Sequence, residues 1–424
     1  MSDPVRQQYE LLPYPARDPR DEAQRLIEGS PSHLLEINHY LFAGARDFSA
    51  PFRALVAGGG SGDGLIMLAQ HLADRRCPAE IVYLDLSTAS RAIAEERARI
   101  RGLANIRFMT GSLLDLPQQG LGTFDYIDCC GVLHHLADPA AGLAALASAL
   151  APDGGMGVMV YGALGRTGVY PMQAMLRTLA AHAPAPARTP AAQLQTAREL
   201  MKQLPATNWL RRNPAIGDHL AGGDAGLHDL LLHAQDRAYS VAELAALASG
   251  AGLEIAAFIE PWRYDPASYL SDVGLLQRTS VLNPIERAGF AEQLAGNLKR
   301  HIVYLVRRGR AATSVARPSD RAMVPVLRLQ DDGFVAGLRG RGVLKVAIDG
   351  IELRFQIPPH AADILAAIDG QRSIADIHEA LGPKLDELKR WNDFKPAFDR
   401  VYELFNKLNR LFLMRPGATP HEPR

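Results

Sequence analysis

Short apolar runs alternate with longer amphipathic stretches from Phe52 onward. Apolar runs of four to seven residues are typical of buried strands, and the intervening stretches have helical spacing. Strands that alternate with helices build a parallel sheet through right-handed crossovers. The pattern therefore predicts an α/β fold with a doubly wound sheet, whose strands lie at residues 53–57, 81–84, 106–109, 124–127, 156–160, 253–259 and 301–306.

The pattern changes in three places, which divide the chain. Residues 1–50 precede the first strand and are expected to form an N-terminal lid or strap, and residues 51–310 a main domain with a helical insertion at about 163–238. A polar linker is expected at 311–321. Residues 322–424 combine a hairpin around Asp349-Gly350 with helices at 361–368, 373–381 and 398–413, which predicts a small α+β winged-helix-like domain.

The balance of basic and acidic residues limits which kinds of binding partner are expected. The chain has 46 basic and 46 acidic residues, so bulk charge does not favour nucleic acid. Residues 320–424 carry 16 basic and 15 acidic residues, which argues against a DNA-binding regulator that uses the last domain. No apolar run has the length of a membrane span, and three cysteines make no disulfide framework, so we expect a cytoplasmic protein without a membrane partner.

A glycine cluster directly follows the first predicted strand. Gly58, Gly60 and Gly62 would let backbone N–H groups approach a ligand, either a dinucleotide or S-adenosylmethionine. Asp85 ends the second strand, where a carboxylate can accept hydrogen bonds from ribose hydroxyls. The alternatives are a glycine-rich turn without a ligand and an aspartate that only caps the next helix.

Four segments, 56–62, 83–87, 111–117 and 124–136, resemble the ordered motifs of class I S-adenosylmethionine-dependent methyltransferases. The run Val-Leu-His-His-Leu at 132–136 is the most diagnostic, and the resemblance covers 51–165 and 240–307. It implies a Rossmann-like seven-stranded sheet, S-adenosyl-L-methionine as cofactor and S-adenosyl-L-homocysteine as product. The implied cofactor contacts are Gly58, Gly60 and Gly62 under the methionine part, Asp85 at the ribose, Leu86, Ser112 and Leu113 at the adenine, and Cys130 and Gly131 at the methionine end.

Two departures from the family pattern keep an alternative open. The family usually has acidic residues at the positions of Val56 and Ser112, and Asp63 is a neighbour that would offset the first loss. The main hypothesis is a methyltransferase that transfers a methyl group by in-line displacement to a peptide or protein side chain or to a small molecule. The alternative is a catalytically inactive S-adenosylmethionine-binding sensor.

Candidate catalytic residues lie where the predicted strands end. His134 and His135 follow the fourth strand and Tyr161 ends the fifth, at the edge where open sheets bind ligands. Tyr14 belongs to residues 8–17, which resemble an element that precedes the catalytic domain in some bacterial methyltransferases and suit a lid. For each of them, a packing role is the alternative.

Further polar residues suit the acceptor. The predicted substrate contacts are Asn38 and His39, which lie a little upstream of the first strand and would close the cofactor site, and His228, His233 and Arg237 in the insertion. A metal held by His228, His233 and Asp236 is disfavoured because the two histidines are five positions apart, so we predict none.

The last domain also carries a resemblance. Residues 361–381 resemble PqqD-type winged-helix domains that hold peptides, and the hairpin would offer an edge strand to an extended peptide. The alternative is a packing or dimerisation module, through which the chain would form a homodimer.

Overall fold

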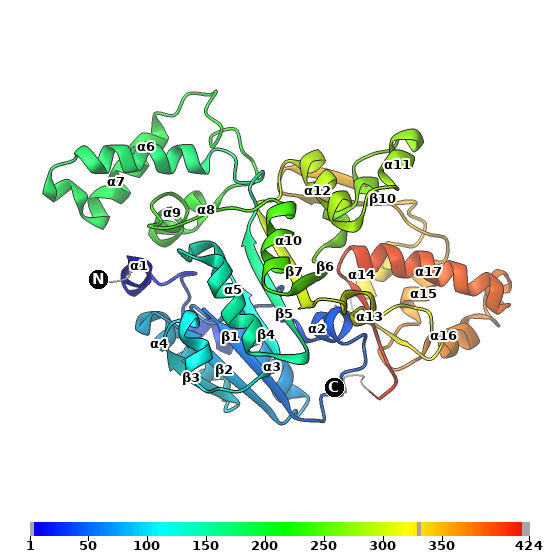
Figure 1. The fold of residues 1–424 in the computed structure, drawn as a ribbon. Helices are drawn as coiled ribbons and strands as arrows, with labels where there is room; N and C mark the ends of the chain where they lie inside the picture. Colours follow the sequence, from blue (N-terminus) through cyan, green and yellow to red (C-terminus); the bar gives the residue numbers. More distant parts are fainter. Residues whose placement is uncertain (1–3, 329–331, 418–424) are drawn as a thin grey trace.

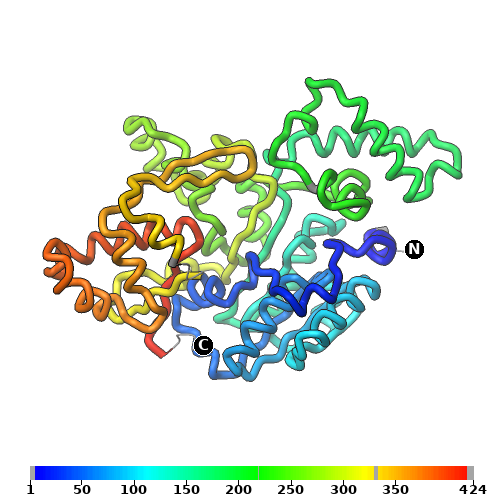
Figure 2. The backbone as a smooth tube through the Cα atoms, turned by 180° about the vertical axis from the view of Figure 1, so that it is seen from behind, coloured from blue at the N-terminus to red at the C-terminus, as the bar shows by residue number. Residues whose placement is uncertain are grey.

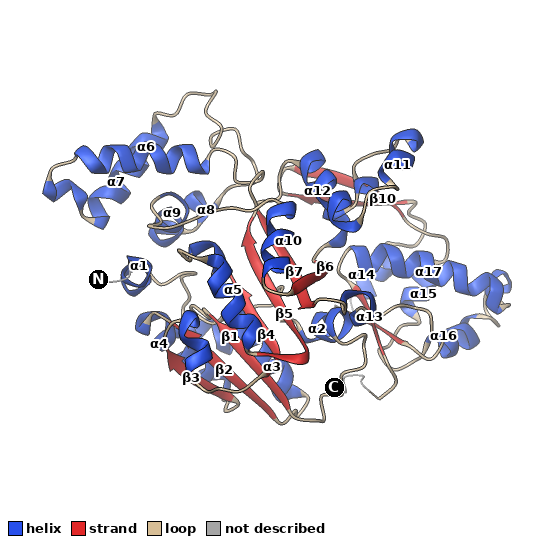
Figure 3. Cartoon of the chain, viewed as in Figure 1, coloured by secondary structure: helices blue, strands red, loops and turns tan. Residues whose placement is uncertain are grey.

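A seven-stranded sheet forms the centre of the computed structural model, which describes residues 4–328 and 332–417 (Figure 1). The strand order is β3-β2-β1-β4-β5-β7-β6, and β7 runs antiparallel to both of its neighbours (Figure 3). The predicted Rossmann-like fold is confirmed, and each predicted strand is present. The strands are β1 (Phe52–Ala57), β2 (Ala79–Asp85), β3 (Ile106–Thr110), β4 (Phe124–Cys130), β5 (Leu150–Tyr161), β6 (Leu253–Phe258) and β7 (Arg300–Arg307).

Helices cover both faces of the sheet, and each face has its own apolar core. Local signals set their ends: Ser87 accepts the Ser90 N–H at the start of α4, and Gly102 ends it with a φ of 68°. A capping box of Ser240 and Glu243 starts α10. The helices around the sheet are α1 (Pro4–Leu11), α2 (Leu34–Leu41), α3 (Asp63–Asp74), α4 (Thr88–Arg101), α5 (Pro139–Ser148), α10 (Val241–Gly250), α11 (Val273–Thr279), α12 (Pro284–Ala295) and α13 (Ala311–Ser314).

The segment between β5 and α10 forms a helical cap with an apolar core of its own. Its helices are α6 (Val169–His182), α7 (Pro190–Lys202), α8 (Asp218–Ala221) and α9 (Gly223–Leu231). Both backbone views show α6 and α7 projecting from the body, with α9 between them and the sheet (Figures 1 and 2).

A second small domain follows the sheet. It contains β8 (Val324–Leu327), α14 (Asp332–Gly337), β9 (Val343–Ile348), β10 (Ile351–Gln356), α15 (Ala361–Ala366), α16 (Ile374–Leu381), α17 (Trp391–Lys407) and β11 (Leu411–Met414). The predicted Asp349-Gly350 hairpin is confirmed as β9 and β10. The predicted helix at 398–413 is wrong at both ends, because α17 begins earlier and Asn409 turns the chain with a φ of 57° into β11, which pairs with β8.

The two parts of the chain are in close contact. The tip of the hairpin docks on the main domain, where Asp349 pairs with Arg263 at 2.9 Å and with Lys299 at 3.4 Å. At the other side, the buried His39 accepts the Leu413 N–H at 3.0 Å. No helix in the described ranges is both long and apolar enough to cross a bilayer.

Candidate active site

The glycine loop leads from β1 into α3 at the carboxyl edge of the sheet. Gly58, Gly60 and Gly62 have φ values of 72°, 52° and 98°, which side chains disfavour. A Cβ atom on Gly58 would lie 2.3 Å from a Val132 methyl group, so the close approach of the turn after β4 also favours glycine there. The loop therefore exposes backbone in a conformation that suits a bound ligand.

Asp85 joins the glycine loop to the start of α4. Its carboxylate accepts the Gly60 N–H and the Ser87 N–H, each at 2.8 Å. Burial raises the pKa of Asp85, although the residue keeps partial exposure beside Leu86. A fixed carboxylate at a strand end, with lone pairs left for hydroxyl donors, fits the ribose of a nucleoside.

The other predicted cofactor contacts lie at the same edge. Ser112 caps a 3-10 helix by accepting the Leu114 N–H at 3.2 Å, and Leu113 points into the apolar core. Cys130 and Gly131 end β4 in partial exposure, and Gly131 has a φ of 80°. The strand ends thus bring the predicted residues to one edge, which fits an adenosyl cofactor.

An acidic group stands next to Val56, although not on its strand. Asp128 of β4 pairs in register with Val56 of β1, and both belong to the face covered by α3. Its Oδ2 would lie 3.0 Å from a Cβ atom on Gly64, in the first turn of α3, and Ser32 donates a hydrogen bond to it. Burial raises the pKa of Asp128 to about 6, and no cation pairs with it in the described part of the chain.

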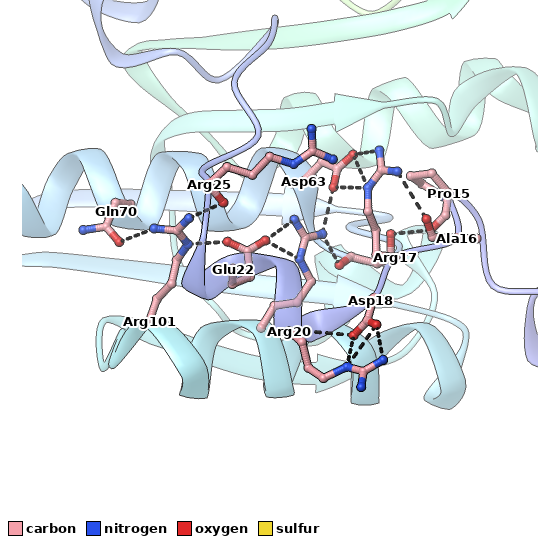
Figure 4. Close-up of polar contacts among 12 residues, drawn as sticks. Pro15, Ala16, Arg17, Asp18, Arg20, Glu22, Arg25, Asp63, Gln70 and Arg101 are labelled. Carbon is pink, nitrogen blue, oxygen red and sulfur yellow. Dashed lines mark hydrogen bonds and ion pairs between the residues drawn. The ribbon is translucent and has the colours of Figure 1, made fainter.

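Asp63, unlike Asp128, pairs with two arginines. Arg17 donates three hydrogen bonds to it, from Nε at 2.9 and 3.2 Å and from Nη2 at 2.6 Å, and Arg97 donates a fourth at 2.8 Å (Figure 4). These guanidinium groups lower the pKa of Asp63 against the effect of burial. Asp63 therefore holds residues 9–25, which we call the strap, against the glycine loop. Asp128, and not Asp63, is the carboxylate at the level of Val56.

The strap, residues 9–25, lies directly on the glycine loop. The Tyr14 carbonyl oxygen would be 3.2 Å from a Cβ atom on Gly60, and Ser61 donates to the Pro15 carbonyl at 2.8 Å. Glu10 accepts the Thr88 N–H at 2.7 Å at the start of α4, and this bond lowers the pKa of Glu10. Tyr14 is thus placed at the loop through its backbone.

A buried polar cluster lies beside this edge, where α1, β5 and α9 meet. Asp229 accepts the Tyr9 hydroxyl at 3.1 Å and the Tyr161 hydroxyl at 2.9 Å. The Tyr9 hydroxyl also lies 3.2 Å from His233 Nε2, and the His233 ring stacks on His135 at 3.7 Å. Burial raises the pKa of Asp229 and lowers that of His233 to about 3. We call these five residues the acceptor cluster.

His134 and His135 have different environments. His134 is fully buried and stacks on Tyr161 at 3.8 Å, and neither ring nitrogen has a hydrogen-bond partner among the described residues. His135 places Nδ1 2.9 Å from the Gln235 carbonyl oxygen, so Nδ1 carries the proton and Nε2 keeps its lone pair. Burial lowers the pKa of His135 to about 4, which keeps this lone pair free at neutral pH.

A buried ion pair supports the cluster from the cap side. Arg166 pairs with Asp236 at 3.0 Å, and its guanidinium lies 3.6 Å from the centre of the Tyr161 ring. Sequence reasoning missed Arg166, Tyr9 and Asp229. Tyr9 lay within the segment interpreted as a lid and Asp229 beside His228, but no local spacing relates positions 220 residues apart.

The other predicted substrate contacts lie elsewhere. Asn38 bonds the Arg46 backbone, and His39 is buried against the last domain, where it contacts Asn406 at 3.1 Å. His228 is half-buried on α9, and the exposed Arg237 packs over the Tyr239 ring at 4.5 Å. Of the predicted acceptor-side residues, the structure brings together His135, His233 and Tyr161, with His134 beneath them.

The acceptor cluster has the residue types of a metal site, since possible ligand atoms of His135, Asp229 and His233 lie within 4.8 Å of one another. However, His233 Nδ1 accepts the Gln235 N–H at 3.1 Å, so the proton of the neutral ring resides on Nε2. Both nitrogens of His233 are then engaged, which disfavours metal ligation.

Comparison with known proteins agrees with this geometry. Residues 55–156 match the family model of a methyltransferase domain. PKMT2 from Rickettsia typhi in complex with AdoHcy has a similar fold, with a TM-score of 0.63 and 16% identity over 92% of this chain and 76% of that chain. A second PKMT2 structure from the same organism gives a TM-score of 0.62 at 15% identity, again over 92% and 76% of the two chains.

One curated relative is closer in sequence. An uncharacterized protein of Synechococcus sp. is 38% identical over 216 residues, which are 50% of this chain and 50% of the relative. The chain thus spans about half the length of this curated relative. The residues that match the methyltransferase family model, 55–156, extend from strand β1 to strand β5 of the Rossmann-like sheet.

Proposed function

We propose that the protein is an S-adenosylmethionine-dependent methyltransferase that acts on a peptide or protein side chain or on a small molecule. The observation that carries the proposal is the contact between the Gly60 N–H and the Asp85 carboxylate, which supports a nucleoside-type site within the residues that match the family model. S-adenosylmethionine, when bound, supplies a methyl group that is already activated as a sulfonium. The chain then has to position a nucleophile and exclude water.

Each part of the site has a role in this proposal. Asp85 would hold the ribose, and the backbone of Gly58 and Gly131 would line the methionine end. Asp128 would supply the negative charge that the family usually places at Val56, because it stands at the same level of the neighbouring strand. A buried carboxylate without a paired cation favours a positively charged ligand nearby.

The acceptor cluster would receive the nucleophile. His135 Nε2 is able to accept a hydrogen bond from the acceptor at neutral pH, because burial lowers the pKa of the ring to about 4 and keeps the ring neutral. Asp229 and the two tyrosine hydroxyls offer further contacts for a polar acceptor. Tyr161 and His134 form the stacked floor beneath this position.

The test combines binding with transfer. Calorimetry with AdoHcy should show binding by the parent chain, loss of at least about 10-fold in affinity for Asp85→Asn, and no change for Asp115→Asn, an exposed control aspartate. S-adenosylmethionine with a labelled methyl group is then incubated with the protein and cell lysate, separated into protein and small-molecule fractions. Label in either fraction supports transfer and indicates the acceptor class. Binding of AdoHcy without transfer of label to any fraction would support the alternative, a catalytically inactive sensor. That alternative rests on the non-acidic residues Val56 and Ser112.

A further inference from the structure

The arm formed by α6, α7 and the following loop, residues 169–215, carries a charge that the rest of the chain does not share. It has six basic residues and one acidic residue, Glu199, so the remainder of the balanced chain has 40 basic and 45 acidic residues. A local excess of this size attracts anionic partners even when the net charge is zero. The basic residues are Arg177, Arg188, Arg198, Lys202, Arg211 and Arg212.

The fold makes little use of these cations. Among the described residues, Arg198 pairs with Asp224, whereas Arg188 and Arg211 donate to backbone carbonyls of the arm itself. Arg198 and Lys202 lie one turn apart on α7, where like charges repel. Since the core of the arm is apolar, its folding does not require this positive charge.

The arm also exposes apolar side chains. Trp209 is 63% exposed, and Met175 and Leu179 are exposed on α6. The loop that carries Trp209 presses on the turn before α6, because a Cβ atom on Gly168 would lie 2.1 Å from the Leu210 nitrogen. That turn follows Arg166, whose guanidinium covers Tyr161. Figures 1 and 2 show the arm projecting beyond α9 and α1.

We propose that this arm is the docking surface for an acidic segment of a protein acceptor. The inference rests on the proposed methyl transfer and narrows its substrate to a polypeptide. Exposed Trp and Arg are the side chains that dominate protein interfaces, and Met175 and Leu179 suit apolar side chains of a partner. A long nucleic acid fits less well, because the acidic remainder of the chain repels a polyanion that extends past the arm.

The experiment measures fluorescence polarisation of a short labelled peptide in which Glu alternates with Gly and Leu. The parent chain should bind it, and should not bind the counterpart with Lys in place of Glu. Arg211→Glu with Arg212→Glu should weaken binding by about 10-fold, since two attractions become repulsions. The control, Arg107→Glu with Arg278→Glu, makes the same charge change at exposed positions on β3 and α11 and should change binding less than about 2-fold.

The outcomes separate the explanations. Equal loss in both double variants would mean that only total charge matters, and tighter binding of an oligouridylate would identify a nucleic-acid surface; either result overturns the proposal. Unchanged affinity for AdoHcy shows that a variant is folded, and Arg177→Glu with Lys202→Glu replaces the first variant if it is not. A parent chain that binds the peptide but not AdoHcy would contradict the methyltransferase and leave the docking surface standing.

Discussion

Glu22 holds the strap on α4 through buried ion pairs. Its side chain is 2% exposed and pairs with Arg97, 1% exposed, at 2.6 Å and with Arg101 (Figure 4). Arg97 in turn donates to the Ser61 carbonyl of the glycine loop at 2.7 Å. Glu22→Gln keeps the shape of the side chain and removes the charge between two guanidinium groups.

The expected loss is large because the cations stay buried. Removal of one partner from a buried ion pair costs about 3–5 kcal/mol. For a cooperative unit of about 300 residues, with an unfolding entropy of about 2 cal/mol/K per residue, a loss of about 4 kcal/mol lowers Tm by about 7 °C. The matched control is Asp18→Asn, since Asp18 pairs with Arg20 on the surface, where the Arg20 side chain is 88% exposed. That variant should stay within about 1 °C of the parent chain.

Two measurements check the reasoning for Glu22→Gln. Differential scanning calorimetry gives Tm, and titration calorimetry gives the affinity for AdoHcy, which should fall because Arg97 also holds the glycine loop. An unchanged Tm would refute the assignment of the buried pair as a stabilising contact. A lower Tm with full affinity would refute the link between strap and loop.

Three other variants test separate parts of the site. Gly58→Ala should lower the affinity for AdoHcy by at least about 10-fold, whereas Gly120→Ala, which has a φ of 63° but no atom within 4 Å of its Cβ position, should leave calorimetric affinity unchanged. Tyr9→Phe removes the hydroxyl from Asp229, and hydrogen exchange of the α1 amides should accelerate by about 10-fold; equal rates would contradict the role of this bond. Asp128→Asn should raise the free energy of unfolding at pH 8 by about 2–3 kcal/mol. The pKa of Asp128 is about 6 in the folded chain and 3.8 in the unfolded chain, so the cost of the buried charge grows as the pH rises from 3.8 to 6. In denaturant melts this advantage should shrink as the pH falls from 6 toward 4, and a gain independent of pH would rule out the buried charge as its cause.

The sheet could be predicted because its signals are local. Each strand is a short apolar run, and the glycine loop and Asp85 follow strand ends within a few positions. The same local reasoning failed at residues 398–413, where helical spacing of apolar residues continues past Lys407. The true end of α17 depends on Asn409 and on pairing of β11 with β8, which is about 80 residues away and leaves no periodic signal.

The acceptor cluster could be predicted only in part. His135 follows a recognisable strand end, but Tyr9 and Asp229 meet only after the cap folds back over α1. The acidic group near Val56 was missed for a related reason, since strand register places Asp128 opposite Val56. A motif compares the residue at one sequence position, here Val56. The site needs a negative charge at one place in space, and a residue on the neighbouring strand, Asp128, is able to supply it.

The strap gives the nucleoside side and the acceptor side a common element. The Tyr9 carbonyl accepts the Ser87 hydroxyl at 3.1 Å, and the Ser87 N–H bonds Asp85. The hydroxyl of the same tyrosine bonds Asp229. A ligand that displaces Tyr9 at Asp229 therefore changes the free energy of a contact beside Asp85, and by linkage a ligand at Asp85 changes affinity at Asp229 by the same factor. We therefore expect the two proposed sites to be coupled through Tyr9 of α1.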